Sequence, residues 1–418
     1  MDPEATLPNR DDVLAEVIRF YLDSGDFNGL PVERYDPRGQ ALGQLLADGL
    51  IEVTSNRAYL NPHIKPWAPR QSWEQERSLT EGLAGAGLAC VYPSPAAMSS
   101  VDLSHMADTP YQRDLASGRG ALDVVYFETA AIEPYRNDPR YSFDLDDFGV
   151  SWGIGDEAWS DDAEPERDKI TTVQAGFAFD RDELAAADPT KRYVCALVCD
   201  LWKLTPTHQQ RMRTWEMEQP ERFTPHPTWW AMQMGHWPEH IGLFDKVLAE
   251  IDAVSQAWQI VFGEPLFRST ERHRAWGWLI RPSSTEWDQF VLLTDQLLSE
   301  NLSTAALDAA GAPTTNAQGD HLGTINRLVE FFYVRTSAPK HQIDETFAPL
   351  KAIRKARQKP AHAAKAPTTD ADAFVRQREV LIKLAKSLEA LRRFFQTHPK
   401  VVSDGWQPAD YLEQWLTV

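Results

Sequence analysis

Arg357 and His362, separated by four residues, have side chains that could together act on a phosphodiester. Histidine titrates near neutral pH and can move a proton. Arginine binds phosphate through two N–H groups and stabilises charge that develops on it in a transition state. Metal-free cleavage of RNA needs a base for the 2′-hydroxyl proton, an acid for the leaving oxygen and a cation for the phosphate. One Arg–His pair supplies part of this set, and a second copy in a dimer would complete it.

The pair lies in a basic segment of an acidic chain. Residues 350–400 contain 13 Lys or Arg and 4 Asp or Glu, whereas the whole chain has a net charge of −19. Arg354, Lys355 and Lys359 flank the pair and are candidate RNA-binding residues. A basic segment of this kind needs an anionic partner, which is either a polyanion such as RNA or an acidic protein surface. The acidic stretch 144–168 of the same chain is one such surface.

Helices are expected to position these residues. After residue 320, apolar residues recur every three or four positions in three stretches, which is the spacing of one helix face. The stretches are 322–332, 347–353 and 380–395. The sequence therefore predicts a C-terminal α-helical domain over residues 321–418, with Arg357 and His362 between its second and third helices.

The segment from Arg357 to His362 resembles the R-x4–6-H motif of the HEPN superfamily, and the resemblance covers residues 320–400. This superfamily consists of helical domains, many of which are RNases of toxin and antiphage systems. Others lack nuclease activity and serve as binding or assembly modules. The resemblance implies a HEPN-like fold, catalysis by Arg357 and His362, and a homodimer formed by the helical domain. Gln358 and Pro360 depart from the motif, because the family usually has Asn, Asp or His after the arginine and a proline can interrupt a helix.

Residues 1–67 are expected to form a winged-helix-like unit. Apolar spacing predicts helices over 11–22 and 39–48, followed by a hairpin of Leu50–Val53 with Ala58–Leu60. Few side chains of the second helix would reach a DNA groove, namely Arg38, Gln40 and Gln44. A DNA-binding regulator acting through residues 11–67 is one alternative function, and a structural or protein-contact role for the unit is better supported.

Residues 68–302 are expected to form a central domain of mixed strands and helices, and residues 303–320 a linker rich in small and polar residues. The continuous apolar run Tyr193–Leu201 is typical of a buried strand. Tryptophans are frequent between Trp202 and Trp287. They could stack on nucleic-acid bases, but packing in the core is their more usual role. The chain as a whole is predicted to be an α+β multi-domain protein.

Other clusters of reactive residues match no cofactor or metal site. Cys195 and Cys199 would lie roughly 13 Å apart on one strand, which is too far to share an ion. His226, His236 and His240 occupy a Pro- and Trp-rich loop that offers no thiol or clear carboxylate to complete a zinc site. No phosphate-binding glycine motif follows a predicted strand. We therefore expect no cofactor and no metal.

Composition limits the cellular context. The three cysteines cannot all pair, which fits a reducing compartment. No stretch approaches 18 continuous apolar residues, and residues 1–10 lack the apolar core of a signal peptide. A cytoplasmic location without membrane contact is expected.

Together with the resemblance, these patterns favour an RNA-binding effector of a bacterial defence or stress system that cleaves RNA without a metal. The rival hypothesis from another class is a non-catalytic interaction or assembly protein. Such a protein would dock its basic helical segment onto an acidic protein partner.

Overall fold

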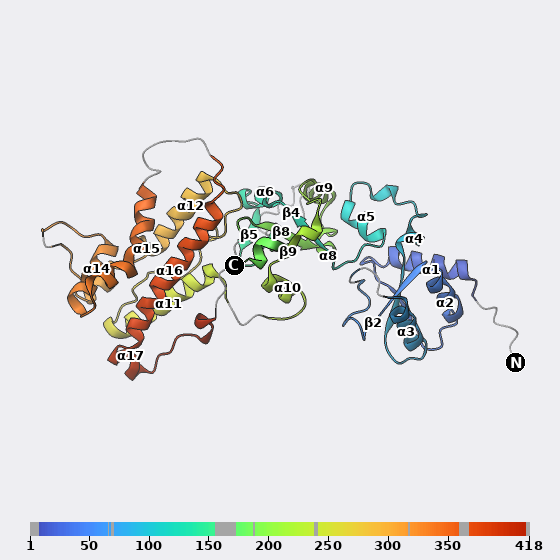
Figure 1. Ribbon diagram of the computed structural model, residues 1–418, viewed down its shortest axis with the longest axis horizontal. Helices are drawn as coiled ribbons and strands as arrows, with labels where there is room; N and C mark the ends of the chain where they lie inside the picture. Colours follow the sequence, from blue (N-terminus) through green and yellow to red (C-terminus); the bar gives the residue numbers. More distant parts are fainter. Residues whose placement is uncertain are drawn as a thin grey trace, which may run out of the picture.

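The computed structural model describes residues 8–65, 67, 71–154, 173–186, 189–237, 241–316, 318–358 and 368–414. Three regions follow one another along its longest axis: an N-terminal unit, a central sheet region and a C-terminal bundle of helices (Figure 1). The strand pairs of both sheets are antiparallel. The predicted mixture of helices and strands, with a helical C-terminal region, is confirmed.

The N-terminal unit packs three helices against a small sheet. Its elements are α1 (Arg10–Asp23), β1 (Leu30–Val32), α2 (Gly39–Ala47), β2 (Ile51–Ser55), α3 (Ser72–Leu83) and β3 (Ala89–Pro93). β3 lies between β1 and β2. All five residues of β3 are buried, because it is the central strand of the sheet and has few polar side chains to expose.

The predicted hairpin within residues 50–60 is wrong. Residues 58–60 form no strand, and the Leu60 side chain is fully exposed. β2 pairs instead with β3, so that Val53 lies opposite Val91. In the sequence, helix α3 lies between these two strands. The turn signal at Ser55 and Asn56 was local. It could not show that a more apolar strand, later in the chain, would pair with β2.

The central sheet has the strand order β4-β8-β7-β6-β5, and β9 pairs with β7 outside this path. Its strands are β4 (Val124–Phe127), β5 (Tyr141–Leu145), β6 (Gly149–Ile154), β7 (Val173–Asp180), β8 (Tyr193–Leu197) and β9 (Phe223–Pro225). The run Tyr193–Leu201, predicted as one strand, is a strand only as far as Leu197 and continues as helix α8 (Val198–Leu201). An unbroken apolar run has no periodicity that separates a buried strand from a buried helical turn.

Short helices pack on β3 of the N-terminal sheet or lie around the central sheet. They are α4 (Pro95–Met98), η1 (Ser104–Met106), α5 (Pro110–Ala116), η2 (Thr129–Ala131), α6 (Glu133–Asn137), α7 (Arg181–Ala185), α9 (Pro206–Thr214), η4 (Pro220–Arg222) and α10 (Pro227–Gln233). The helices α4, α5, α9 and α10 begin at a proline, which is favourable at the first position of a helix because no N–H partner is lost there.

The C-terminal bundle is built around α11 (Leu243–Phe262) and α16 (Ala373–Gln396), which run side by side (Figure 1). The other elements are α12 (Ser284–Asp295), the π-helical turn η5 (Gln296–Glu300), α13 (Thr304–Ala309), α14 (Thr324–Arg335), α15 (Lys340–Gln358), α17 (Pro399–Asp404) and η7 (Asp410–Glu413). The three predicted helices after residue 320 are confirmed as α14, α15 and α16, which bury most of the apolar residues that predicted them.

Part of the segment 303–320, predicted as a linker, is packed into this bundle. It contains α13, whose Ala306 and Leu307 side chains are fully buried. The small residues that suggested a linker also allow α13 to approach α14 closely. The bundle further includes α11 and α12, which lie before the predicted domain start at residue 321.

Asp147, between β5 and β6, joins the sheet to the bundle. Its carboxylate accepts the backbone N–H groups of Phe244 and Asp245, in the first turn of α11, at 2.9 and 3.0 Å. Its carbonyl accepts the indole N–H of Trp278 at 3.2 Å. A Cβ atom at Gly242 would lie 2.0 Å from Asp147, so a glycine is needed for this close approach. Burial, together with the nearby carboxylate of Asp245, raises the pKa of Asp147 to about 7.

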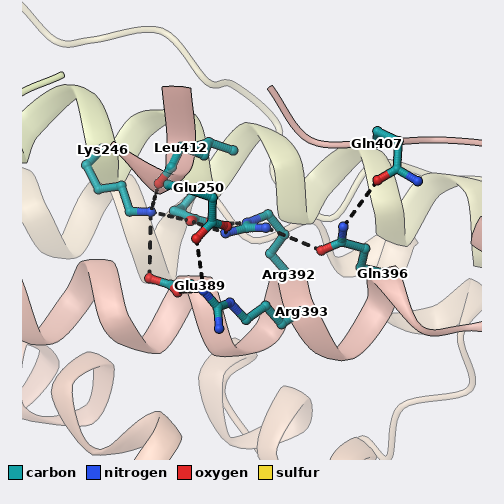
Figure 2. Close-up of polar contacts among 9 residues, drawn as sticks. Lys246, Glu250, Glu389, Arg392, Arg393, Gln396, Gln407 and Leu412 are labelled. Atoms are coloured by element: carbon teal, nitrogen blue, oxygen red, sulfur yellow. Dashed lines mark hydrogen bonds and ion pairs between the residues drawn. The ribbon is translucent and has the colours of Figure 1, made fainter. Parts of the chain in front are cut away.

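A buried network of charges fixes the segment after α17 to the bundle (Figure 2). Lys246 donates to the Glu250 carboxylate at 2.8 Å and to the backbone carbonyl of Leu412. Arg392 donates to Glu250 at 2.8 Å and to Glu413 at 2.8 Å. The side chains of Lys246, Glu250 and Arg392 are buried, and buried charges are tolerated only when they are paired. The segment that carries Leu412 and Glu413 is therefore part of the folded core.

Candidate functional site: a basic cleft beside Arg357

The last turns of α15 carry the described members of the predicted site. Phe347, Leu350 and Ile353 bury one face of this helix. Arg354 and Arg357 project from its other side, with 47% and 31% of their side-chain surface exposed. Cations near the C-terminus of a helix are favourable because the backbone carbonyls there carry partial negative charge. α15 therefore carries several cations near its C-terminus, of which Arg354 and Arg357 are paired with carboxylates.

A buried carboxylate, Asp295, anchors both arginines. It is the last residue of α12 and has no exposed side-chain surface. Nη1 of Arg354 and Nη1 of Arg357 donate to its Oδ2 at 2.9 and 2.7 Å. The hydroxyl of Ser299 donates to its Oδ1. The two arginines are thus held at a fixed spacing by one acidic side chain.

The π-helical turn η5 explains why Arg357 binds two carboxylates at once. In a π-helix, backbone hydrogen bonds join residues five apart, so the side chains of residues i and i+5 lie near one another. Asp295 and Glu300 have this separation, and Nη1 of Arg357 donates to both. These hydrogen bonds raise the pKa of Arg357. Within the described ranges, Nε and Nη2 of Arg357 make no hydrogen bond and remain available as donors.

A cleft of about 320 Å³ opens next to these arginines, and we call it the first cleft. It is lined by Ser299, Gly323, Thr324, Ile325, Asn326, Lys351, Arg354, Lys355 and Gln358. Three of these side chains are cationic. The first residues of α14 form its other end, where the backbone N–H groups have no partner within the helix and carry partial positive charge. Such a surface suits a phosphate.

The structure brings together three of the five predicted site residues. Arg354 and Lys355 line the first cleft, and Arg357 lies beside it. Lys355 is exposed and has no ion-pair partner in the part of the chain that the structure describes. Lys359 and His362 lie outside the described residues. Whether His362 faces Arg357 therefore stays a prediction.

A second cleft of about 320 Å³ lies on the other side of η5. Its lining residues are Arg268, Ser269, Glu271, His273, Trp276, Leu293, Gln296, Leu297, Glu300 and Asn301. Glu300 lines this second cleft and binds Arg357, whereas the preceding residue, Ser299, lines the first cleft. Arg354 Nη1 lies 4.0 Å from Glu300. The two clefts are therefore neighbours, separated by η5 and the two arginines.

Asp295 and Glu300 were not predicted as site residues. Asp295 interrupts the apolar run Phe290–Leu298, and an acidic residue at a buried helix position needs a cationic partner. That interruption was the available signal. The partner could not be identified from it, because α12 and α15 are far apart in the sequence.

The three residues that could contact DNA in the alternative function differ in whether their side chains are free to bind it. Gln40 and Gln44 are exposed on α2. Arg38 is engaged within the unit, because its guanidinium donates to Asp36 at 2.7 Å and to Glu16 at 2.6 Å. The single cation of the predicted recognition helix is thus already neutralised.

In the described part of the histidine cluster, His226 is buried and His236 is exposed. His226 caps α10 by accepting the backbone N–H of Thr228 at 3.1 Å, whereas His240 lies outside the described residues. Cys195 is on β8 but Cys199 is on α8, so the predicted common strand is wrong. Both thiols are free. Burial raises the pKa of Cys199 to about 12, which keeps it protonated at neutral pH.

The tryptophans of the 202–287 stretch range from buried to exposed. Trp258, Trp276 and Trp278 are buried, as the packing interpretation predicts. Trp215 and Trp237 are exposed and lie outside the linings of both clefts. The buried group cannot stack on a nucleic acid without unfolding.

The acidic stretch 144–168 is described only as far as residue 154. In this part, Asp147 caps α11 and Asp144 is exposed. Within the described ranges, the arginines of α15 bind Asp295 and Glu300, which belong to the bundle itself. The described contacts therefore leave docking of the acidic stretch onto the basic helix as a prediction.

None of the described helices combines the length and apolar content that a membrane crossing requires. Within the described ranges, no three His, Cys, Asp or Glu residues are grouped as metal ligands. Comparisons with known proteins return no matching family model, no matching curated protein and no matching solved structure.

Proposed function

We propose that this protein binds RNA along the last turns of α15 and cleaves it at a phosphate that Arg357 contacts. The first cleft carries the proposal. Lys351, Arg354 and Lys355 face one hollow together with the N-terminus of α14, and Arg357 adjoins it. Cations and helix N–H groups that converge in this way form a strong site for a phosphate.

A linear polyanion fits this surface better than a small anion does. Along the sequence, residues 350–400 carry nine more cations than anions in a chain of net charge −19, so the cations are not limited to those that line the cleft. A strand of RNA can contact several of these cations at once, and each contact releases a bound counterion. The acidic remainder of the protein repels phosphates and would confine binding to this region.

The proposed cleavage uses the 2′-hydroxyl of the RNA as the nucleophile. Its oxygen forms a bond to phosphorus as its proton passes to a histidine, and the 5′-oxygen of the next nucleotide leaves with a proton from an acid. Arg357, held at Nη1, has Nε and Nη2 to stabilise the negative charge on the phosphate. We assign the proton transfer to His362. A HEPN-like dimer would supply a second histidine, so that one acts as base and the other as acid.

The proposed setting is the cytoplasm of a bacterium, where such an effector would serve defence or stress responses. Free Cys90, Cys195 and Cys199 fit a reducing compartment.

RNA binding is tested by gel shift over a series of salt concentrations. We expect log K to fall linearly with log salt, and Lys355→Glu to weaken binding to all sequences about equally, because phosphate contacts carry no base information. Lys203→Glu is the matched control: Lys203 is exposed, lies outside residues 350–400 and does not line the cleft. An equal effect of both variants would show that overall charge, and not the cleft, determines binding. Absent or salt-insensitive RNA binding would favour docking of an acidic protein.

Cleavage is tested with purified protein and excess chelator. We expect cutting to continue, products to end in a 2′,3′-cyclic phosphate, and activity to fall when the protein is diluted below the dissociation constant of its dimer. His362→Ala should abolish cutting and leave binding largely intact. Equal cutting by the wild type and His362→Ala at matched purity would assign the activity to a contaminant or another site.

A further inference from the structure

The second cleft has a different chemical character from the first. Its apolar lining is formed by Trp276, Leu293 and Leu297, and polar groups stand at its edge. The amide of Gln296 and the carboxylate of Glu271 are exposed and have no side-chain hydrogen bond within the described ranges. A flat ring with apolar faces and a polar edge would bury its faces against the lining and pair its edge with these groups.

The two clefts differ in the charge of their lining residues and should therefore bind different ligands. Lys351, Arg354 and Lys355 give the first cleft a positive charge. In the second cleft Glu300 is paired with Arg357, and Glu271 and Arg268 carry one charge of each sign. The second cleft therefore suits a neutral ring that donates hydrogen bonds better than it suits a phosphate.

η5 and the two arginines form a wall shared by the two clefts, and one nucleotide can reach across it. Arg357 binds Glu300 at the edge of the second cleft, and Arg354 reaches from the first cleft to within 4.0 Å of the same carboxylate. A phosphate held at Arg357 therefore lies at the boundary between the two clefts. The base attached to the neighbouring ribose can enter the second cleft without leaving the basic surface.

We propose that the second cleft binds a nucleobase with an exocyclic amino group, from the nucleotide next to the phosphate that Arg357 contacts. This inference rests on the proposed RNA binding. Glu271 would accept a hydrogen bond from the amino group, and the amide of Gln296 would pair with the adjacent ring edge, as carboxylates and amides do with cytosine and adenine. Uracil has no amino group and offers the carboxylate only its ring N3–H, between two carbonyl oxygens that the carboxylate repels. The cleft thus selects the base at the cutting position.

The test measures fluorescence anisotropy of labelled 2′-O-methyl homopolymers, which bind but cannot be cleaved. We expect oligo(A) or oligo(C) to bind about tenfold tighter than oligo(U). Glu271→Gln and Gln296→Ala should each reduce this preference and leave oligo(U) affinity unchanged. Both residues are exposed, so the substitutions remove no core packing. Gln342→Ala, an exposed glutamine at the start of α15, is the matched control.

The outcomes separate this inference from the function on which it rests. Equal binding of all three homopolymers to the wild type, or a preference that both variants retain, overturns the nucleobase site and leaves RNA binding in place. A wild type that binds none of the homopolymers overturns the proposed function and this inference with it. A preference that also falls in Gln342→Ala places the selectivity outside the second cleft and overturns the inference.

Discussion

Nη1 of Arg357 lies 2.7 Å from Oδ2 of Asp295, a carboxylate without exposed side-chain surface. Because Asp295 ends a packed helix, its ion pair with Arg357 holds the guanidinium in one position relative to the bundle. Preorganised charge of this kind contributes more to catalysis than a mobile side chain, since no reorganisation is needed when the phosphate reacts. In the proposed cleavage, Asp295 is therefore assigned as a positioning residue for Arg357.

Replacing Asp295 with asparagine should separate RNA binding from cleavage. The variant has one negative charge fewer beside the first cleft, so we expect RNA affinity to stay equal or increase. Arg357 loses its charged anchor, and misplacement of a catalytic group by about 1 Å can lower the rate about 100-fold. Single-turnover cleavage and binding assays on the same preparation measure the two effects. Asp308→Asn, whose exposed carboxylate pairs with the buried Arg327, is the control. A parallel loss of affinity and rate would contradict a positioning role.

The raised pKa of Asp147 predicts a pH-dependent stability difference. The folded protein holds this proton more tightly than the unfolded chain, in which the pKa is near the ordinary value of 3.8. The contribution of Asp147 is therefore complete below pH 3.8 and is lost as the pH rises towards about 7. Compared with Asp147→Asn, the wild type should lose more stability between pH 4 and pH 8 in urea unfolding. Asp144→Asn, exposed on β5, should follow the wild type. Parallel curves for the wild type and Asp147→Asn would refute the prediction.

The buried network should respond unequally to loss of its two glutamates. Glu250→Ala leaves the buried Lys246 and Arg392 without their shared carboxylate, which should cost about 3–5 kcal/mol. Glu413→Ala removes a half-exposed partner of Arg392 and should cost about 1 kcal/mol or less. Urea denaturation at neutral pH measures both. Similar costs for the two variants would show that burial does not set the strength of this network.

Arg38→Ala should destabilise the N-terminal unit without changing affinity for duplex DNA. The substitution leaves the buried carboxylate of Asp36 without its guanidinium partner, which should cost about 1–3 kcal/mol. Arg34→Ala, at an exposed position in the same unit, is the control for charge. Urea unfolding and gel shifts measure the two properties. A sequence-specific loss of DNA binding in Arg38→Ala alone would support the alternative regulator function.

Local sequence signals predicted the C-terminal helices and failed where pairing is long-range. The spacing of Leu381, Leu384 and Leu388 identified α16 because a helix is formed by near neighbours. β3 was missed as the partner of β2 because strand pairing depends on competition between distant segments. For the site, the basic residues were visible in the sequence. The carboxylate that orients them was not, because only the packing of α12 on α15 brings Asp295 to Arg357.

The charge network around Lys246 also sets an order of events during synthesis. A ribosome that has just added Lys246 must add a further 166 residues before the carbonyl that accepts from Lys246 exists. Until then, Lys246 and Glu250 stay in water, where their charges are well solvated. The packing of α16 against α11 is also incomplete at that stage. Contacts between residues so distant in sequence form slowly, because a long loop must close first. The bundle therefore cannot be completed until residue 412 has left the exit tunnel, and a nascent chain stalled before that point would still expose the apolar face of α11 to chaperones.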